Sequence, residues 1–205
     1  MNVVVLDYGS GNLRSAERAL ARAGASVEVT SSLVAAAAAD GLVVPGVGAY
    51  AACMAGIKKL DAGPVIAARV AAGRPVLGIC VGMQIMFSYG DEHGAVTPGL
   101  GLFPGGVTRL RPASGETVPH MGWNTVAPPA GSVLFAGLES ERFYFVHSYA
   151  ATPGPELDGI LVTTTVHGGE FVAAAEAGPL VATQFHPEKS GDAGAALLRN
   201  WVQTL

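Results

Sequence analysis

The sequence has few of the features that mark several large classes of protein. Its 205 residues include two cysteines, Cys53 and Cys80, which are too few for a disulfide framework and resemble no metal site in their spacing. Lysine and arginine number 12 against 16 aspartate and glutamate residues, so the net charge of −4 offers no basic surface to nucleic acid. No apolar run is long enough to cross a bilayer, and the N-terminal segment lacks the basic start of a secretion signal. These absences predict a reduced, cytoplasmic protein with no metal, no cofactor and no nucleic-acid or membrane partner.

What the chain does have is a large apolar fraction, and short apolar runs alternate with helical patterns in its first 90 residues. Half of its residues are hydrophobic. The predicted strands cover residues 3–6, 26–30, 42–44 and 76–79. Helices are expected at 13–23, in the alanine-rich stretch that follows residue 30, through Met54, Ile57 and Leu60, at 64–72, and from Cys80 through Phe87. Four strands that alternate with helices predict a parallel sheet with right-handed crossovers.

The second half has a different texture, in which strands follow one another without helices. Residues 91–106 are rich in glycine and proline, and we expect a long surface loop there. Strands are predicted at 107–110, 123–126, 143–146, 160–166, 171–175 and 180–185, before a last helix at 192–202. The sequence thus predicts one α/β domain over residues 1–205, with a mostly parallel central sheet flanked by helices and a β-rich second half.

Cys80 lies between Gly78 and Gly82 at the end of a short apolar run. This G-x-C-x-G spacing is typical of a nucleophile elbow, where a strand turns abruptly into a helix and side chains two residues away would collide. The turn places the sulfur at a helix N-terminus, where the thiolate is favoured over the thiol. The alternative is that Cys80 is one more small buried residue.

A base and a group to orient it follow the last predicted strand. His186 and Glu188 lie on either side of Pro187, and residues two apart on an extended chain face the same side. Glu188 could hold one imidazole nitrogen while the other faces Cys80. Because the carboxyl ends of parallel strands gather at one edge, we expect His186 near Cys80. Alone, this His-x-Glu pattern is weak, and a structural histidine is the alternative.

A third segment, Gly46-Val47-Gly48, follows the strand that we expect beside the cysteine strand. Its glycines would allow backbone N–H groups to point at a developing oxyanion. Without the cysteine, an ordinary tight turn would be the preferred interpretation.

Seven segments together resemble the class I (triad-type) glutamine amidotransferases, which have a flavodoxin-like α/β fold. Within that family, the 7–12 and 119–124 segments are similar to the glutaminase subunits of imidazole glycerol phosphate synthases. The matching segments are 7–12 (DYGSGN), 45–50 (PGVGAY), 78–84 (GICVGMQ), 99–105 (GLGLFPG), 119–124 (PHMGWN), 145–149 (FVHSY) and 184–190 (QFHPEKS).

The resemblance implies hydrolysis of glutamine to glutamate and ammonia, without a cofactor. By this resemblance Cys80 forms a glutamyl thioester, His186 moves protons and Glu188 orients the imidazole. The segment Gly46, Val47 and Gly48 corresponds to the oxyanion strand. The residues that would hold the amino-acid end of the substrate are Gln84, Glu92, Ser148 and Tyr149, the last two through their backbone. A carboxylate at Glu92 suits the α-ammonium group of glutamine, although a solvated loop charge is an equal alternative.

The family's partner is a cyclase with a (β/α)₈ barrel, which forms a heterodimer with the glutaminase and receives its ammonia without release to water. Trp123, Tyr144 and Lys189 match positions near that interface, but the two aromatic side chains could equally lie in the core or at the rim. The remaining reactive side chains are interpreted as structural or solvated: Cys53, His93, His120 and His167.

Three other functions stay open. The chain could be the glutaminase of another synthase, such as the one that makes pyridoxal phosphate. It could be a cysteine peptidase or thiol hydrolase, although Gln84 after the elbow and the His186-Pro187-Glu188 segment argue against that class. A redox-sensing thiol in a binding module is the non-enzymatic alternative.

Overall fold

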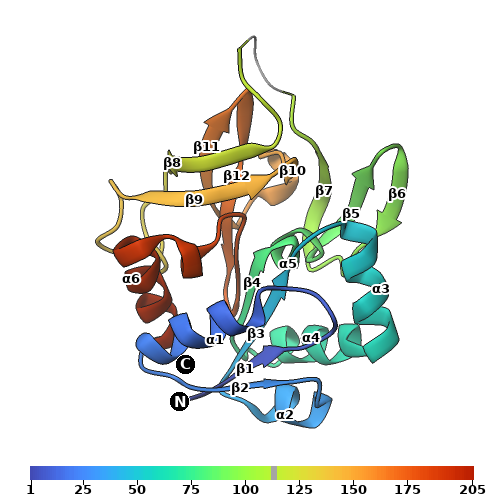
Figure 1. The fold of residues 1–205 in the computed structure, drawn as a ribbon, viewed down its shortest axis with the longest axis vertical. Coiled ribbons are helices and arrows are strands. Elements are labelled where there is room, and N and C mark those ends of the chain that lie inside the picture. The colour runs from blue at the N-terminus through green and yellow to red at the C-terminus, as the bar shows by residue number, and fades with distance from the viewer. Residues whose placement is uncertain (112–114) are drawn as a thin grey trace.

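The computed structural model describes residues 1–111 and 115–205, and its largest sheet has seven strands in the order β11-β12-β13-β4-β3-β1-β2 (Figure 1). Five of them pair in parallel: β1 (Asn2–Leu6), β2 (Ser26–Thr30), β3 (Gly41–Gly46), β4 (Val76–Cys80) and β13 (Leu180–Thr183). The antiparallel strands β12 (Gly169–Ala177) and β11 (Leu161–His167) extend one edge. The predicted parallel sheet is confirmed, and β3 lies beside β4 as expected.

Helices cover both faces of this sheet, with α1 and α6 on one face and α3 and α4 on the other (Figure 1). Their bounds are α1 (Leu13–Arg22), α2 (Leu33–Ala38), α3 (Tyr50–Leu60), α4 (Ala62–Ala71) and α6 (Gly191–Val202). In α1, Ala16 and Leu20 are buried while its arginines face outward, which is the amphipathic pattern that fixes a surface helix on a sheet. None of the helices in the two described ranges is long and apolar enough to cross a membrane.

Arg69 on α4 joins three of these elements at the amino ends of the parallel strands. Its guanidinium group is buried and donates hydrogen bonds to five backbone carbonyl oxygens, those of Ala36, Ala37, Ala39, Asp40 and Pro75. The last carbonyls of a helix lack partners within it, so the guanidinium satisfies the end of α2 and the starts of β3 and β4 together. Burial lowers the pKa of Arg69 to about 10.

Two smaller sheets lie beyond the carboxyl ends of the parallel strands, at the top of Figure 1. One has the order β10-β7-β5-β6, and the other pairs β8 with β9 in antiparallel register. Their strands are β5 (Phe87–Glu92), β6 (Ala95–Pro98), β7 (Phe103–Arg109), β8 (His120–Thr125), β9 (Arg142–His147) and β10 (Tyr149–Ala151). Short 3₁₀ helices cover Pro155–Leu157 and Pro187–Lys189.

Two predictions in this region were wrong. The helix after Cys80, α5 (Val81–Gln84), is only one turn long, and Phe87 begins β5 instead of continuing the helix. The expected loop at 91–106 holds the end of β5, all of β6 and the start of β7. Its glycines serve close packing: a Cβ atom on Gly99 would lie 2.2 Å from the Tyr50 hydroxyl oxygen, and one on Gly106 would lie 2.2 Å from the Tyr89 ring.

Candidate active site

Cys80 is the last residue of β4 and lies in a strained backbone conformation, with φ of 56° and ψ of −115°. Positive φ is uncommon outside glycine and is maintained only where the surrounding structure enforces it. A Cβ atom on Gly82 would come within 1.9 Å of the Val44 carbonyl oxygen, and one on Gly78 within 2.9 Å of the Gly82 carbonyl oxygen. The strand–turn–helix geometry predicted for an elbow is therefore present, and both glycines are required by close backbone contacts.

The His186 and Glu188 side chains are joined by a hydrogen bond of 2.7 Å between Nδ1 and Oε1, and each is only 3% exposed. The segment forms a 3₁₀ turn over Pro187–Lys189 instead of the extended stretch that we expected. The turn brings the two side chains together all the same. Burial lowers the pKa of His186, but hydrogen bonding to Cys80 and Glu188 and the negative charges of those two groups outweigh it and raise the pKa to about 9.

Cys80 and His186 meet at a cavity of about 220 Å³, which collects most of the predicted site residues. The cavity is lined by Val47, Gly48, Cys80, Val81, Gln84, Glu92, Val146, His147, Ser148, Tyr149, His186 and Lys189. Four predicted residues are outside this lining: Gly46, Glu188, Trp123 and Tyr144. Among residues 1–111 and 115–205, no cluster of three or more metal-binding side chains is present.

The backbone of Val47 is held by Ser10, from the loop between β1 and α1. The N–H of Val47 donates to Ser10 Oγ at 3.1 Å, and Ser10 Oγ is 3.0 Å from the Val47 carbonyl oxygen, to which it donates. The buried Cys53 thiol also donates to that oxygen, at 3.4 Å. In this conformation the Val47 N–H has a partner and is not free for an oxyanion, while Gly48 follows at φ of +83°.

Gln84 lines the cavity, and its side-chain nitrogen connects two other residues. Nε2 donates to the Tyr149 carbonyl oxygen at 2.8 Å and to Gln184 Oε1 at 2.9 Å. The Gln184 Nε2 in turn lies 3.8 Å from Cys80 Sγ. Gln84 thus links the Tyr149 backbone, through Gln184, to the cysteine. Sequence reasoning gave Gln184 no role, and its place one residue before Phe185 in the motif was the only signal.

Glu92 lines the cavity, beside Gly48 and Tyr149. One carboxylate oxygen also accepts a hydrogen bond of 2.9 Å from the backbone N–H of Tyr50, at the first residue of α3. A carboxylate at this position satisfies an N–H that has no partner within the helix.

His147 is a lining residue that sequence reasoning did not identify. It ends β9, and its register partner in β8 is His120, which we expected to be merely structural. The ring nitrogens of the two histidines are hydrogen-bonded at 3.0 Å. His147 directly followed a predicted strand, whereas His120 lay three residues before the predicted start of another, which in the structure begins at His120 itself. A single sequence also does not reveal which strands pair.

Of the three predicted interface residues, Trp123 and Tyr144 pack against each other and Lys189 lines the cavity. Trp123 on β8 is 47% exposed, and its ring packs edge-on against Tyr144 on β9, with centroids 6.1 Å apart. Lys189 reaches the cavity itself.

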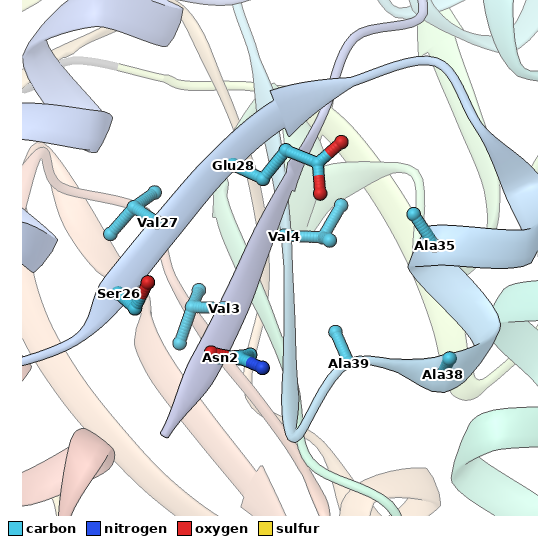
Figure 2. Close-up of a pocket in the computed structure, with 9 residues that line it drawn as sticks. All are labelled: Asn2, Val3, Val4, Ser26, Val27, Glu28, Ala35, Ala38 and Ala39. Carbon is cyan, nitrogen blue, oxygen red and sulfur yellow. The ribbon is translucent and has the colours of Figure 1, made fainter.

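A larger hollow, of about 340 Å³, lies elsewhere in the fold, between β1, β2 and α2 (Figure 2). Its walls are valine and alanine side chains with Asn2, Ser26 and the exposed Glu28, and it contains neither a cysteine nor a histidine. It therefore lacks the cysteine and the histidine that line the smaller cavity together.

Comparison with known proteins gives a consistent result. A family model described as glutamine amidotransferase class-I matches residues 4–205. Proteins named imidazole glycerol phosphate synthase subunit HisH from Mycolicibacterium paratuberculosis and Thermobifida fusca are 62% and 60% identical over 205 and 210 residues. The alignments cover 100% and 99% of this chain and 98% of each relative.

Solved structures share the fold at low sequence identity. A crystal structure titled glutamine amidotransferase matches with a TM-score of 0.76 at 22% identity, covering 98% of this chain and 97% of that one. The structure of PurLQS from Thermotoga maritima matches with a TM-score of 0.72 at 20% identity, covering 99% of this chain and 97% of that one.

Proposed function

We propose, because the chain belongs to the class I glutamine amidotransferase family, that it is the glutaminase subunit of an imidazole glycerol phosphate synthase in histidine biosynthesis. The observation that carries the chemistry is the single cavity shared by Cys80 and His186, with Glu188 bonded behind the imidazole. The observation that carries the pathway is identity of 60–62% along almost the whole chain to proteins of that name. Residues 1–205 act as one amidotransferase domain.

In the first half of the reaction, the Cys80 thiolate attacks the side-chain amide carbon of glutamine. The resulting tetrahedral intermediate collapses when protonated His186 gives its proton to the departing nitrogen, which releases ammonia and leaves a glutamyl thioester. In the second half, His186 takes a proton from water as the water attacks the thioester, and glutamate leaves as the thiolate re-forms. The raised pKa of His186, about 9, suits the first step because the imidazole carries a proton at neutral pH.

Glu188 acts through His186. It accepts a hydrogen bond from Nδ1, so Nε2 is the nitrogen that would exchange protons on the Cys80 side. Glu92 would pair with the α-ammonium group of the substrate, and the backbone of Ser148 and Tyr149 would hold its carboxylate. Gln84 contributes by fixing the Tyr149 carbonyl. No cofactor takes part in this mechanism.

The oxyanion would be stabilised by backbone N–H groups of Gly46-Val47-Gly48, but the Val47 N–H is bonded to Ser10. The described conformation is therefore a resting one, and turning the Val47 peptide away from Ser10 would complete the site. The flanking glycines permit such a rotation.

The partner would be a cyclase subunit with a (β/α)₈ barrel, which receives the ammonia within a heterodimer. We expect that subunit to dock against the exposed Trp123, its neighbour Tyr144, and Lys189, which lines the cavity. Exposed aromatic side chains are enriched in protein interfaces. Both cysteines are free thiols, which fits a reaction in the reducing cytoplasm.

The proposal is tested by substituting Cys80→Ala in the complex with the cyclase. Glutamine-dependent turnover should be lost while turnover from added ammonium salts persists, because the cysteine serves only the hydrolytic half. The matched variant Cys53→Ala should retain glutamine-dependent turnover. Retained activity in Cys80→Ala would refute the mechanism. Full glutaminase activity with the cyclase of pyridoxal phosphate synthesis, and none with the imidazole glycerol phosphate cyclase, would favour the alternative synthase.

A further inference from the structure

The structure contains a buried pair of histidines that the proposed reaction does not use. His120 begins β8 and His147 ends β9, and the two residues are direct cross-strand partners. His120 Nδ1 lies 3.0 Å from His147 Nε2, and His147 Nδ1 lies 2.9 Å from the Tyr149 carbonyl oxygen. The two residues are 5% and 6% exposed. Buried polar groups cost free energy unless each has a hydrogen-bond partner. The direction of donation along this chain of hydrogen bonds can therefore be worked out.

The Tyr149 carbonyl oxygen, at the end of this hydrogen-bonded chain, determines which ring nitrogen of His147 carries a hydrogen. Because the Tyr149 oxygen can only accept, His147 Nδ1 carries a hydrogen and donates it. A neutral His147 then has a lone pair on Nε2, which accepts the hydrogen on His120 Nδ1. A second proton on His147 would force the hydrogen of His120 onto Nε2, where it would face the side-chain NH₂ group of Asn124 at 3.4 Å.

Both histidines are therefore neutral, in fixed tautomers. Burial lowers the pKa of His147 to about 3 and that of His120 to about 4, and neighbouring histidines lower both further. The ionisable groups that face the pair are His167 and Glu116 near His120, and His186 near His147. A neutral His147 adds no positive charge beside His186.

The hydrogen-bonded chain from His120 through His147 ends at the backbone of Ser148 and Tyr149, two residues that line the cavity. The Tyr149 carbonyl oxygen accepts from His147 and from Gln84, and the Ser148 carbonyl oxygen accepts from the Leu110 N–H at 2.9 Å. In a trans peptide the N–H points opposite to the carbonyl, so the Tyr149 N–H is turned away from Leu110. Since Ser148 and Tyr149 line the cavity, we infer that this N–H faces the cavity and would meet an anion inside it.

We propose that His147, supported by His120, is a positioning residue for the amino-acid end of glutamine. It fixes the Ser148–Tyr149 backbone through the Tyr149 carbonyl, so that the backbone N–H meets the α-carboxylate of the substrate. The inference rests on the proposed glutaminase function and adds to it a residue that acts on substrate binding and not on the sulfur. Gln84 donates a hydrogen bond to the same carbonyl oxygen, so both side chains help to fix the Ser148–Tyr149 backbone.

Two reagents that attack the same sulfur separate positioning from chemistry. One is a glutamine analogue with an electrophile at its side-chain carbonyl and an intact amino-acid end. The other is iodoacetamide, which has no amino-acid end. In His147→Leu, the second-order rate of inactivation by the analogue should fall at least tenfold while the iodoacetamide rate stays within about twofold. The tenfold loss corresponds to about 1.4 kcal/mol, the size of one hydrogen bond. In the complex, KM for glutamine should rise more than kcat falls.

Three further variants complete the test. His147→Asn can still donate to the Tyr149 carbonyl and should recover most of the analogue rate. His120→Leu should show a smaller loss of the same kind. His93→Leu is the matched control: its exposed ring packs edge-on against the Tyr149 ring at 6.1 Å without bonding the carbonyl, so the ratio of the two rates should not change.

The outcomes are distinct. If His147→Leu slows both reagents equally, or slows neither, the positioning role is wrong. If His147→Leu fails to fold, His120→Leu decides the question by the same two criteria, and a His147→Asn variant that loses as much of the analogue rate as expected for a lost donor also counts against the role. Ammonia-dependent turnover of the complex checks that docking is intact in each variant. If the unaltered protein reacts no faster with the glutamine analogue than with iodoacetamide, the proposed function itself fails, whatever the variants do.

Discussion

Replacing Ser10 with alanine should raise the glutaminase rate of the isolated subunit. The hydroxyl of Ser10 is bonded to both the N–H and the carbonyl oxygen of Val47, at 3.1 and 3.0 Å, and these bonds hold the peptide in the orientation that lacks an oxyanion donor. Removing the hydroxyl destabilises the resting orientation and leaves the active one unchanged. The balance between the two should therefore shift toward the active orientation.

The expected size follows from the two hydrogen bonds. Each neutral hydrogen bond contributes about 0.5–1.5 kcal/mol net, and Val47 is 41% exposed, so water can replace part of the loss. The Cys53 thiol also keeps its bond to the Val47 carbonyl. A net shift of about 1–2 kcal/mol is expected, which corresponds to a basal rate about 5 to 30 times higher if the active orientation is a minor one.

The assay is glutamate release by the purified subunit, repeated with the cyclase and its ligand. The basal rate should rise while the fully stimulated rate changes little, so the stimulation factor should shrink. Ser10→Thr keeps a hydroxyl and is the matched control. A basal rate for Ser10→Ala at or below that of the unaltered protein, with its thermal midpoint preserved, would refute the argument that Ser10 restrains the oxyanion segment.

Three other outcomes are expected. Because the pKa of His186 is raised to about 9, its proton is held below that pH and lost above it, so kcat/KM of the complex should fall as pH rises through about 9; a limb near 6.5 would contradict this. Arg69→Met removes the donor of five hydrogen bonds to backbone carbonyl oxygens, although the Ala39 and Pro75 oxygens keep a second donor, from Arg74 and from the Leu42 N–H. The free energy of unfolding in urea titrations should fall by about 3 kcal/mol or more, whereas Arg14→Ala, at a 79% exposed side chain, should leave it nearly unchanged. A glutamine-like electrophile should label Cys80 and spare Cys53, whose thiol pKa is raised by burial; peptide mapping that finds the label on Cys53 would overturn the assignment.

The parallel sheet was predictable because buried parallel strands appear in sequence as continuous apolar runs, as in β1, β3 and β4. The errors came where one pattern has two meanings. The apolar run at Ile85 to Phe87 fits a helix or a strand equally well at that length. The glycines at 99 and 106 contributed to the prediction of a loop, whereas they are needed to let Tyr50 and Tyr89 pack closely. That requirement depends on tertiary contacts that a single sequence does not contain.

The candidate site also combines local features, which the sequence shows, with contacts between residues far apart in the sequence, which it does not. The elbow at Cys80 and the His186–Glu188 pair were visible because their geometry is local, set by residues within a few positions of each other. The bond between Ser10 and Val47 spans 37 positions, and that between Gln84 and Gln184 spans 100. Such contacts exist only once the strands have been assembled, which is why the orientation of the Val47 peptide and the His147 chain emerged from the structure.

The residues that line the cavity come from different sheets. Cys80 ends a strand of the seven-stranded sheet and His186 follows another, whereas Ser148 is the single residue between β9 and β10, which belong to the two small sheets. Under the proposed function, a change of length or sequence in the link around Ser148 would alter how the amino-acid end of the substrate is held, without touching the strands that carry Cys80 and precede His186. Substrate range and hydrolysis could then be varied independently, through different sheets.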